Sequence, residues 1–386
     1  MLTRGVMRLF GLPSIRLGRV FGIPIELDTS WFFVLFLVAA SLTTSYFPEA
    51  LPDQPPVMYA AIGLLTALVF FGSLIGHEFA HSLVAKAGGL RISRVTLFMF
   101  GGVSQMDDEP RSPGQEFVVA LAGPAASLLF AGAFWGLAAA ARTLGVAPAV
   151  WVPLDYLSLI NISLAVFNLL PGFPLDGGRV LRAAFWAATK DLLKATRWAS
   201  RAGQGLGMVL VAIAVLGVLG GSFDLVWLAV MGWFLSVLAG GAYEQQKVRS
   251  TLAQIPLRDI MTSPAVLAPA DATLEELAHS HFLGGRHRRY PVVDGGRVIG
   301  IIDLERSGAI PREKWTEVTA AEAAARELAE VVTGPDASVE SVLPLLEPSG
   351  PGAVLVVEDG RLAGIVTRAD VIRAVREASD KGSASR

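Results

Sequence analysis

Three residues in the first third of the chain have the types and spacing of a zinc-dependent hydrolytic site. His77 and His81 are four residues apart, so a helix places both imidazoles on one face, about one turn from each other. Two imidazoles at this spacing can hold one zinc ion. Glu78, which lies between them, can take a proton from the attacking water and then protonate the leaving amine. We therefore expect a zinc site with Glu78 as the general base.

The surroundings of this motif are apolar from residue 57 to residue 87, which changes how the motif is interpreted. On a soluble helix, the same pattern is often a solvated face. Within an apolar run that reading fails, and two alternatives are left: a functional site, or a polar cluster that holds membrane helices together. Ionisable residues inside a membrane are costly and mark functional sites by default. The motif thus favours hydrolysis inside or beside a lipid bilayer.

A hydrolytic zinc site needs a third protein ligand and one open position. The chain has no cysteine, so that ligand must be a histidine or a carboxylate. Asp176 is the best candidate because it follows an apolar run and is flanked by Pro171, Pro174, Gly177 and Gly178. Proline and glycine end a helix there and let the backbone aim one side chain inward. A bound dication would offset the cost of a carboxylate at this depth.

Two amide side chains lie near the same apolar run. Asn161 and Asn168 are candidate hydrogen-bond donors to the oxyanion or to the substrate backbone. The alternative for both is ordinary hydrogen bonding between helices.

Composition separates a membrane part from a soluble part. Of the 386 residues, 53% are apolar and 17% charged, and the mean hydropathy is +0.53. Residues 30–242 hold nearly all of the apolar surplus, so we expect an N-terminal cytoplasmic segment over 1–29, a transmembrane domain over 30–250 and a soluble tail. A net charge of −2 gives no indication of a nucleic-acid partner. Residues 1–29 show no pattern of a cleavable signal peptide.

Six segments are long and apolar enough to span a bilayer, and we place them near 30–47, 57–86, 117–141, 151–170, 204–221 and 224–242. Arginine and lysine concentrate on alternate connections, which predicts cytoplasmic N- and C-termini in a multi-pass protein of the cell membrane. This topology puts the histidine pair in the inner half of the second span. The fourth span also ends inside, just before Asp176, so the candidate ligands reach the same depth.

Residues 90–106 alternate in character and are rich in β-branched and aromatic types. They predict a short membrane-associated β hairpin that turns at Gly101-Gly102. Such a hairpin needs protein or headgroup cover, because open strand edges do not survive in lipid. Its edge could bind an extended substrate by strand addition.

The tail contains an internal repeat. Residues 290–303 align without gaps with residues 354–367, and each copy predicts strand, turn and strand followed by a helix. Upstream, the segments that begin at Asp271 and Asp336 are matched helix starts. The tail is therefore expected to be a two-copy α/β domain.

The membrane part resembles the site-2 protease family of intramembrane zinc metalloproteases. The resemblance rests on His-Glu-Phe-Ala-His at 77–81, on Asn-Leu-Leu-Pro-Gly-Phe-Pro-Leu-Asp-Gly-Gly at 168–178, on residues 17–31 and on Ala-Gly-Pro at 122–124. It implies that His77, His81 and Asp176 bind zinc and that Glu78 is catalytic. The chain carries Ser127 where members of that family often carry asparagine. The implied activity is regulated intramembrane proteolysis of a single-pass membrane protein, such as an anti-sigma factor or a membrane-held transcription-factor precursor.

The tail resembles a tandem pair of CBS domains, over residues 256–309 and 327–378. This resemblance implies adenine-nucleotide binding (ATP or AMP), regulation of the protease, and homodimers formed through the pair. The ribose-contacting pattern of that family is met in the second copy by Gly364, Thr367 and Asp370. In the first copy, Asp303 and Arg306 stand at the matching positions of Thr367 and Asp370, so a site there is altered or lost. A dimerisation module without ligand is the alternative.

Two rival functions fit parts of this pattern. CBS pairs also occur on ion channels and magnesium transporters, and in a divalent-cation transporter or channel the three candidate ligands would line a cation path. An inactive relative that only sequesters partners is the other rival. The complete set of ligands and base favours the hydrolase.

Overall fold

The computed structural model describes residues 14–98, 101–106, 108–282, 289–303, 307–324, 332–346, 352–358 and 361–375. These form two compact units, residues 1–246 and 247–386. We describe each unit by itself.

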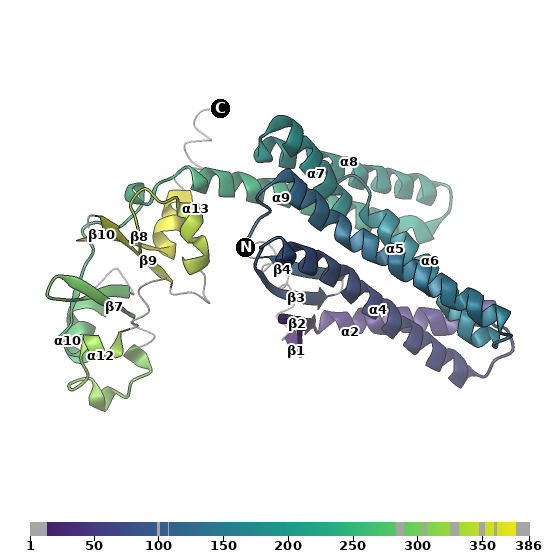
Figure 1. Ribbon diagram of the computed structural model, residues 1–386, viewed down its shortest axis with the longest axis horizontal. Coiled ribbons are helices and arrows are strands. Elements are labelled where there is room, and N and C mark those ends of the chain that lie inside the picture. The colour runs from purple at the N-terminus through teal and green to yellow at the C-terminus, as the bar shows by residue number, and fades with distance from the viewer. Residues whose placement is uncertain are drawn as a thin grey trace. The chain divides into compact units, whose positions relative to one another are not determined.

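The first unit is built from long apolar helices, which Figure 1 shows from purple to teal. Six helical segments are long and apolar enough to cross a membrane: Ser30–Ala50, Pro56–Ala87, Pro113–Thr143, Pro148–Asn168, Leu192–Leu219 and Phe223–Ala253. Three of them start with proline, whose fixed φ and missing N–H suit the first helical position. The six predicted spans are therefore confirmed, with longer helices than hydropathy alone indicated.

The helices have the following bounds: α2 Ser30–Ser41, α3 Phe47–Ala50, α4 Pro56–Ala87, α5 Pro113–Thr143, α6 Pro148–Asn168, α7 Asp176–Thr189, α8 Leu192–Leu219 and α9 Val226–Ala253. A short π-helical turn, Leu42–Tyr46, joins α2 to α3 within the first span. The amphipathic helix α7 lies in a stretch that sequence analysis treated as a plain connection.

A four-stranded sheet of order β1-β2-β3-β4 belongs to the same unit. Its strands are β1 Ser14–Val20, β2 Ile23–Asp28, β3 Ile92–Phe98 and β4 Gly101–Met106. The predicted β3–β4 hairpin is present, but its turn is not at Gly101-Gly102, because both glycines lie in β4. Residues 99–100, between the two strands, lie outside the described residues. Sequence analysis did not foresee β1 and β2, which fall in the segment 1–29.

The sheet lies against the second half of α4. Ser104 of β4 donates from Oγ to the carbonyl of Glu78 at 3.2 Å, and its hydroxyl also contacts that of Ser82. On the sheet's inner face, Leu27 and Leu97 pack with Phe71 in one apolar cluster. The sheet therefore covers the part of α4 that carries the histidine pair.

The second unit contains two similar halves, as the internal repeat predicts. Its sheets have the orders β5-β6-β7 and β10-β9-β8, and in each the repeat forms an antiparallel hairpin. Thr273 and Ser338 cap the two matched helix starts. The elements are β5 Ala268–Pro269, α10 Leu274–Leu277, β6 Arg289–Asp294, β7 Arg297–Asp303, α12 Ala320–Ala323, β8 Val332–Thr333, α13 Val339–Val342, β9 Ala353–Glu358 and β10 Arg361–Thr367.

Candidate metal centre

Helix α4 brings the two motif histidines together in the interior of the membrane unit. His77 and His81 are 2% and 3% exposed, and their Nε2 atoms lie 3.3 Å apart. Gly123, on a neighbouring helix, leaves room for the two rings. The helical spacing thus produces the paired arrangement that the motif predicts.

Asp176 joins the pair from the first turn of α7. Its Oδ2 lies 3.1 Å from His81 Nε2 and 3.3 Å from His77 Nε2. Close backbone approaches at Gly177 and Gly178 hold the loop that leads into α7. A Cβ at Gly177 or Gly178 would strike backbone atoms of residues 169–173, so glycine is needed there for packing.

The Nδ1 atoms of the two imidazoles already have hydrogen-bond partners. His81 Nδ1 lies 2.7 Å from the carbonyl of Val119, which can only accept, so Nδ1 carries a proton. His77 Nδ1 lies 2.9 Å from Ser127 Oγ. A metal-binding histidine typically bonds through its other nitrogen to such a partner, which fixes the tautomer and the ring orientation. The two Nε2 atoms thereby face each other and Asp176.

The separations fit a tetrahedral zinc ion. Two ligand atoms that are each about 2.0–2.1 Å from such an ion stand roughly 3.3–3.4 Å apart. The three observed separations among His77 Nε2, His81 Nε2 and Asp176 Oδ2 are 3.3, 3.3 and 3.1 Å. Among the described residues, these three are the one group of histidine and carboxylate side chains whose ligand atoms converge in this way.

The surroundings of Asp176 favour its ionised form. Burial raises the pKa of Asp176, but hydrogen bonds from His77 and His81 outweigh burial and hold that pKa well below its usual range. The carboxylate is therefore ionised at neutral pH, which is the form that binds a cation.

Gly123 on α5 lies directly against the ligand atoms of the centre. A Cβ at this position would collide with the Nε2 atoms of both His77 and His81. The absence of a side chain at Gly123 therefore leaves room at the ligand atoms themselves.

Glu78 lies next to the centre along α4, under strand β4. A Cβ at Gly102 would stand 3.0 Å from Glu78 Cδ and 3.2 Å from Glu78 Oε1. Gly102 thus serves close packing over the carboxylate rather than a hairpin turn, which explains why the predicted turn position was wrong.

An ion pair links the start of α5 to α7. Glu116, fully buried, pairs with Arg182, whose guanidinium also stacks over Phe173 at 5.1 Å. Asp176 stands at the head of the helix that carries Arg182, so this pair holds α7 against α5. The sequence pattern predicts a functional role for neither residue.

The two asparagines are not placed on the centre by any recorded hydrogen bond. The Nδ2 atoms of Asn161 and Asn168 donate to the carbonyls of Leu157 and Leu164, four residues back on their own helix. The buried Oδ1 of Asn161 has no partner among the described residues. Each Nδ2 carries a second N–H, so a donor role for either asparagine stays a prediction.

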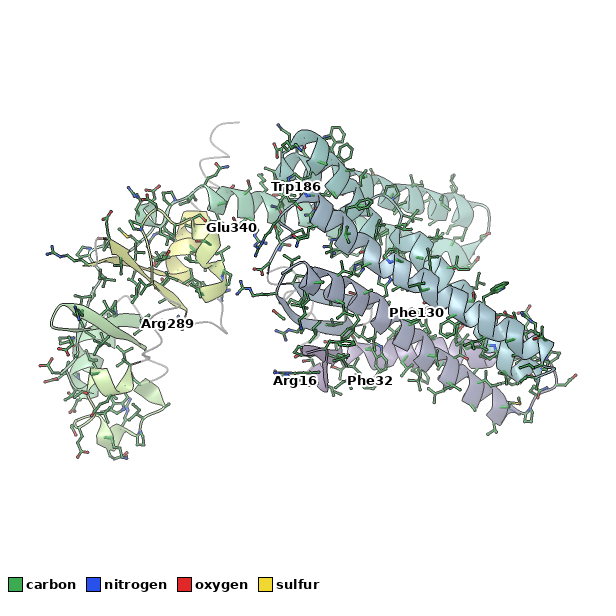
Figure 2. All side chains as sticks on the ribbon, in the orientation of Figure 1. Arg16, Phe32, Phe130, Trp186, Arg289 and Glu340 are labelled. Carbon is green, nitrogen blue, oxygen red and sulfur yellow. The ribbon has the colours of Figure 1, made fainter. Side chains whose placement is uncertain are left out.

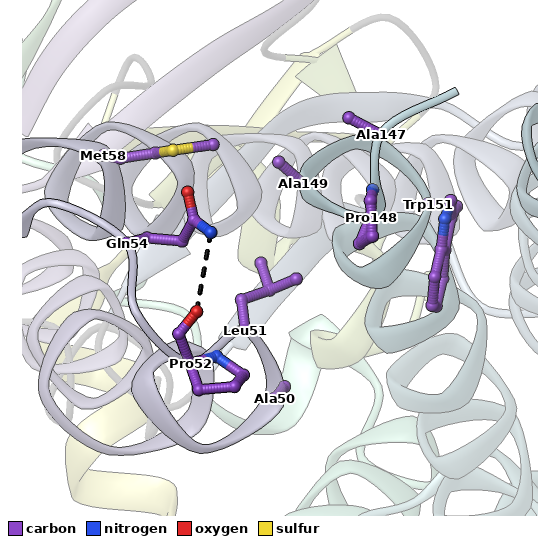
Figure 3. A pocket seen from close by; sticks show the side chains of 9 residues that line it. All are labelled: Ala50, Leu51, Pro52, Gln54, Met58, Ala147, Pro148, Ala149 and Trp151. Atoms are coloured by element: carbon purple, nitrogen blue, oxygen red, sulfur yellow. Dashed lines mark hydrogen bonds between the residues drawn. The ribbon is translucent and has the colours of Figure 1, made fainter. Parts of the chain in front are cut away.

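A separate pocket lies at the other end of the helices. It measures about 350 Å³ and is bordered by the segment before α4 and by the α5–α6 connection, as Figure 3 shows. None of the candidate ligands contributes to its lining: Ala50, Leu51, Pro52, Gln54, Met58, Ala147, Pro148, Ala149 and Trp151.

In the second unit, Asp370 brings together the residues of the nucleotide pattern. Its Oδ2 accepts from the backbone N–H of Thr367 at 2.9 Å and from Thr367 Oγ1 at 2.7 Å. Its Oδ1 accepts from Thr262 at 3.2 Å and from Arg373 at 2.7 Å. These bonds also cap the helical residues 368–375. In the first copy, Arg306 lies outside the described residues.

Comparison with known proteins supports the same two-part division. The family model "Peptidase family M50" matches residues 65–144 and 145–214, and the model "CBS domain" matches residues 257–306 and 325–377. The chain is 33% identical to "Putative zinc metalloprotease sll0528" of Synechocystis, over 94% of this chain and 96% of that protein. It is 31% identical to "Zinc metalloprotease MJ0392" of Methanocaldococcus jannaschii, over the same shares of the two chains.

A solved structure, the site-2 protease from Methanocaldococcus jannaschii, is 28% identical. The match covers 60% of this chain and 95% of the solved chain, with a TM-score of 0.42. The family model and the two metalloprotease relatives confirm the family resemblance drawn from the two motifs. This multi-pass membrane chain belongs to the zinc metalloproteases of peptidase family M50, the site-2 protease family, and carries a pair of CBS domains after its last membrane helix.

Proposed function

We propose that the chain is an intramembrane endopeptidase that cleaves a peptide bond in or near the transmembrane segment of a single-pass membrane protein. The observation that carries this proposal is the convergence of His77, His81 and Asp176 beside Glu78, inside a bundle of apolar helices. These three side chains would hold the zinc ion.

Zinc at this position supplies Lewis-acid polarisation of the scissile carbonyl and makes water easier to deprotonate. The chain's own residues do the remaining work. Glu78 takes the proton of the attacking water and passes it to the leaving amine. Val119 and Ser127 keep the two imidazoles in position, and the sheet covers Glu78 from one side. With both termini cytoplasmic, this chemistry takes place toward the cytoplasmic side.

A helical substrate must be unwound before its backbone can be attacked, and β4 offers a place for the extended form. Strand β4 pairs with β3 along one edge and has no second partner strand in the described part of the chain. Its Gly102 lies directly over Glu78. A substrate strand added to β4 would therefore run past the base.

Metal removal tests the function. Purified full-length protein in vesicles should cleave a co-reconstituted single-pass substrate, lose that cleavage with a zinc chelator and regain it when zinc is returned. Cleavage that is unaffected by complete zinc removal would contradict the proposal. The divalent-cation transporter considered above would instead move metal across the vesicle without cleaving protein, and membership in a metalloprotease family favours the protease.

For the CBS pair, we infer that adenine nucleotide binds at Thr367 and Asp370 and regulates cleavage. Helix α9 gives such regulation a physical route. It belongs to the last membrane span, and its end residue Leu252 lies in the core of the second CBS copy with Val339. A ribose hydroxyl at Asp370 would compete with Arg373 for the same carboxylate oxygen.

Asp370→Asn should therefore weaken ATP or AMP binding by the full-length protein at least about tenfold, because ligand bonds to a charged group contribute about 1.5–3 kcal/mol. Isothermal titration calorimetry measures the nucleotide affinity of each variant. Asp303→Asn, at the first-copy position that matches Thr367, is the control and should bind as the wild type does. Equal binding by both variants would show that the nucleotide site lies elsewhere. The same preparations, run on a size-exclusion column, test the homodimer expected of CBS pairs.

A further inference from the structure

The β1–β2 hairpin presents an apolar and basic surface that no other described part of the chain covers. All seven residues of β1 are exposed, and so is the turn residue after it. Leu17 is 56% exposed and Phe21 is 69% exposed, which is unusual for side chains of this size in a folded sheet. Two arginines, Arg16 and Arg19, lie between the apolar residues; Arg16 pairs through Nε with Glu26 at 3.4 Å, but its side chain stays 83% exposed.

Two tethers hold this hairpin at the end of the membrane helices. Strand β2 ends at Asp28, and the Asp28 carboxylate accepts from the N–H of Ser30, the first residue of the first span. The carbonyl of Phe21 accepts from Lys86 Nζ at 2.9 Å, and Lys86 lies in the last turn of α4. The hairpin is therefore anchored where α2 begins and α4 ends, which is one boundary of the bilayer.

The apolar side of the hairpin continues a surface that already faces lipid. Ile15 pairs with Leu27 across the two strands, so both project from the same face of the sheet. Leu27 is buried against Trp31 of α2, whereas Ile15 extends beyond this cover. Further along α2, Phe36 is 68% exposed, as a lipid-facing residue of a membrane span would be. Figure 2 labels Arg16 of β1 and Phe32 of α2 in this region.

The open edge of β1 limits how deep the hairpin can lie. In the described chain β1 pairs only with β2, so its outer N–H and C=O groups have no strand partner. Such an edge is too costly in hydrocarbon, but headgroups and water can satisfy it. Arginine side chains at the same level reach lipid phosphates, whereas their apolar neighbours enter the acyl boundary.

We propose that the β1–β2 hairpin is an interfacial lipid anchor that binds anionic headgroups. Arg16 and Arg19 bind phosphate. The apolar residues insert into the acyl boundary: Ile15, Leu17, Val20 and Phe21. The anchor fixes the height of the four-stranded sheet relative to the bilayer. Because β4 belongs to this sheet and lies over Glu78, the anchor also sets the level at which an extended segment can pass the base.

The absence of cysteine makes the test direct. Phe21→Cys or Leu17→Cys gives a single thiol for a nitroxide label in the full-length protein, reconstituted in phosphatidylcholine vesicles with or without phosphatidylglycerol. Collision rates with oxygen and with a water-soluble nickel complex report the depth of the label. Phe36→Cys is the lipid-facing reference, and Asp294→Cys, at the exposed end of β6 in the second unit, is the aqueous reference.

Labels at 17 and 21 should be several-fold less accessible to nickel than the label at 294, and shallower than the label at 36. Phosphatidylglycerol should increase this protection. The double variant, Arg16→Gln with Arg19→Gln, should remove the increase. Each arginine charge is expected to change the population of inserted hairpins about fivefold. Circular dichroism that matches the wild type shows that each variant is folded.

Nickel accessibility at 17 and 21 equal to that at 294 overturns the proposal. Protection that arises only when substrate is added, or only at protein concentrations that produce dimers, also overturns it, because β1 would then be a strand-pairing edge.

Discussion

Glu78→Gln is expected to lower the rate of peptide cleavage about 10²–10⁴-fold, the range that a general base contributes, without loss of bound zinc. Glutamine has nearly the size of glutamate, so it fits in the narrow space beside Gly102. It cannot take a proton from water. Since the three converging ligand atoms belong to other residues, the metal centre keeps its donors.

Two measurements on the same preparation decide this prediction: the cleavage rate of a reconstituted single-pass substrate, and zinc content by elemental analysis. Glu49→Gln is a matched control, because it removes an exposed carboxylate near the end of the first span. Full activity in Glu78→Gln would exclude Glu78 as the general base. Joint loss of zinc and activity would assign Glu78 a role in holding the centre rather than in proton transfer.

The convergence of the three candidate ligands could be predicted from the sequence because its signals are local. His77 and His81 share a helix face by spacing alone, and an apolar flank excludes a solvated helix. Asp176 stood out through prolines and glycines that end an apolar run. The six spans followed from hydropathy, since a bilayer imposes one length on every crossing helix.

The groups that support the ligands left no such signal. Val119 contributes a backbone carbonyl to His81, and any residue type could supply that oxygen. The pairing of Glu116 with Arg182 depends on how α5 meets α7, 66 residues apart along the chain. Strands β1 and β2 are short, β1 is exposed along its whole length, and β2 pairs in parallel with β3, which is distant in sequence. Tertiary packing decides each of these, and sequence periodicity does not report it.

Gly123→Ala is expected to abolish zinc binding, although it adds only one methyl group. In a membrane helix, glycine to alanine is normally neutral or favourable, because alanine loses less backbone freedom on folding. Here the added Cβ would collide with the Nε2 atoms of His77 and His81, the atoms that would ligate the ion. Both rings are fixed from behind by Val119 and Ser127, so they cannot retreat without breaking those hydrogen bonds.

The matched control lies on the same helix. Gly132 and Gly136 of α5 face open space, and a Cβ at either position would meet no atom within 4 Å. Gly132→Ala should therefore keep about one zinc per chain and wild-type cleavage, with unfolding free energy unchanged or higher by about 0.5–1 kcal/mol. Gly123→Ala should be helical by circular dichroism yet lack zinc and activity. If it instead bound zinc as tightly as the control does, the ion would have to lie away from Gly123, and the assignment of His77, His81 and Asp176 as its ligands would fail with it.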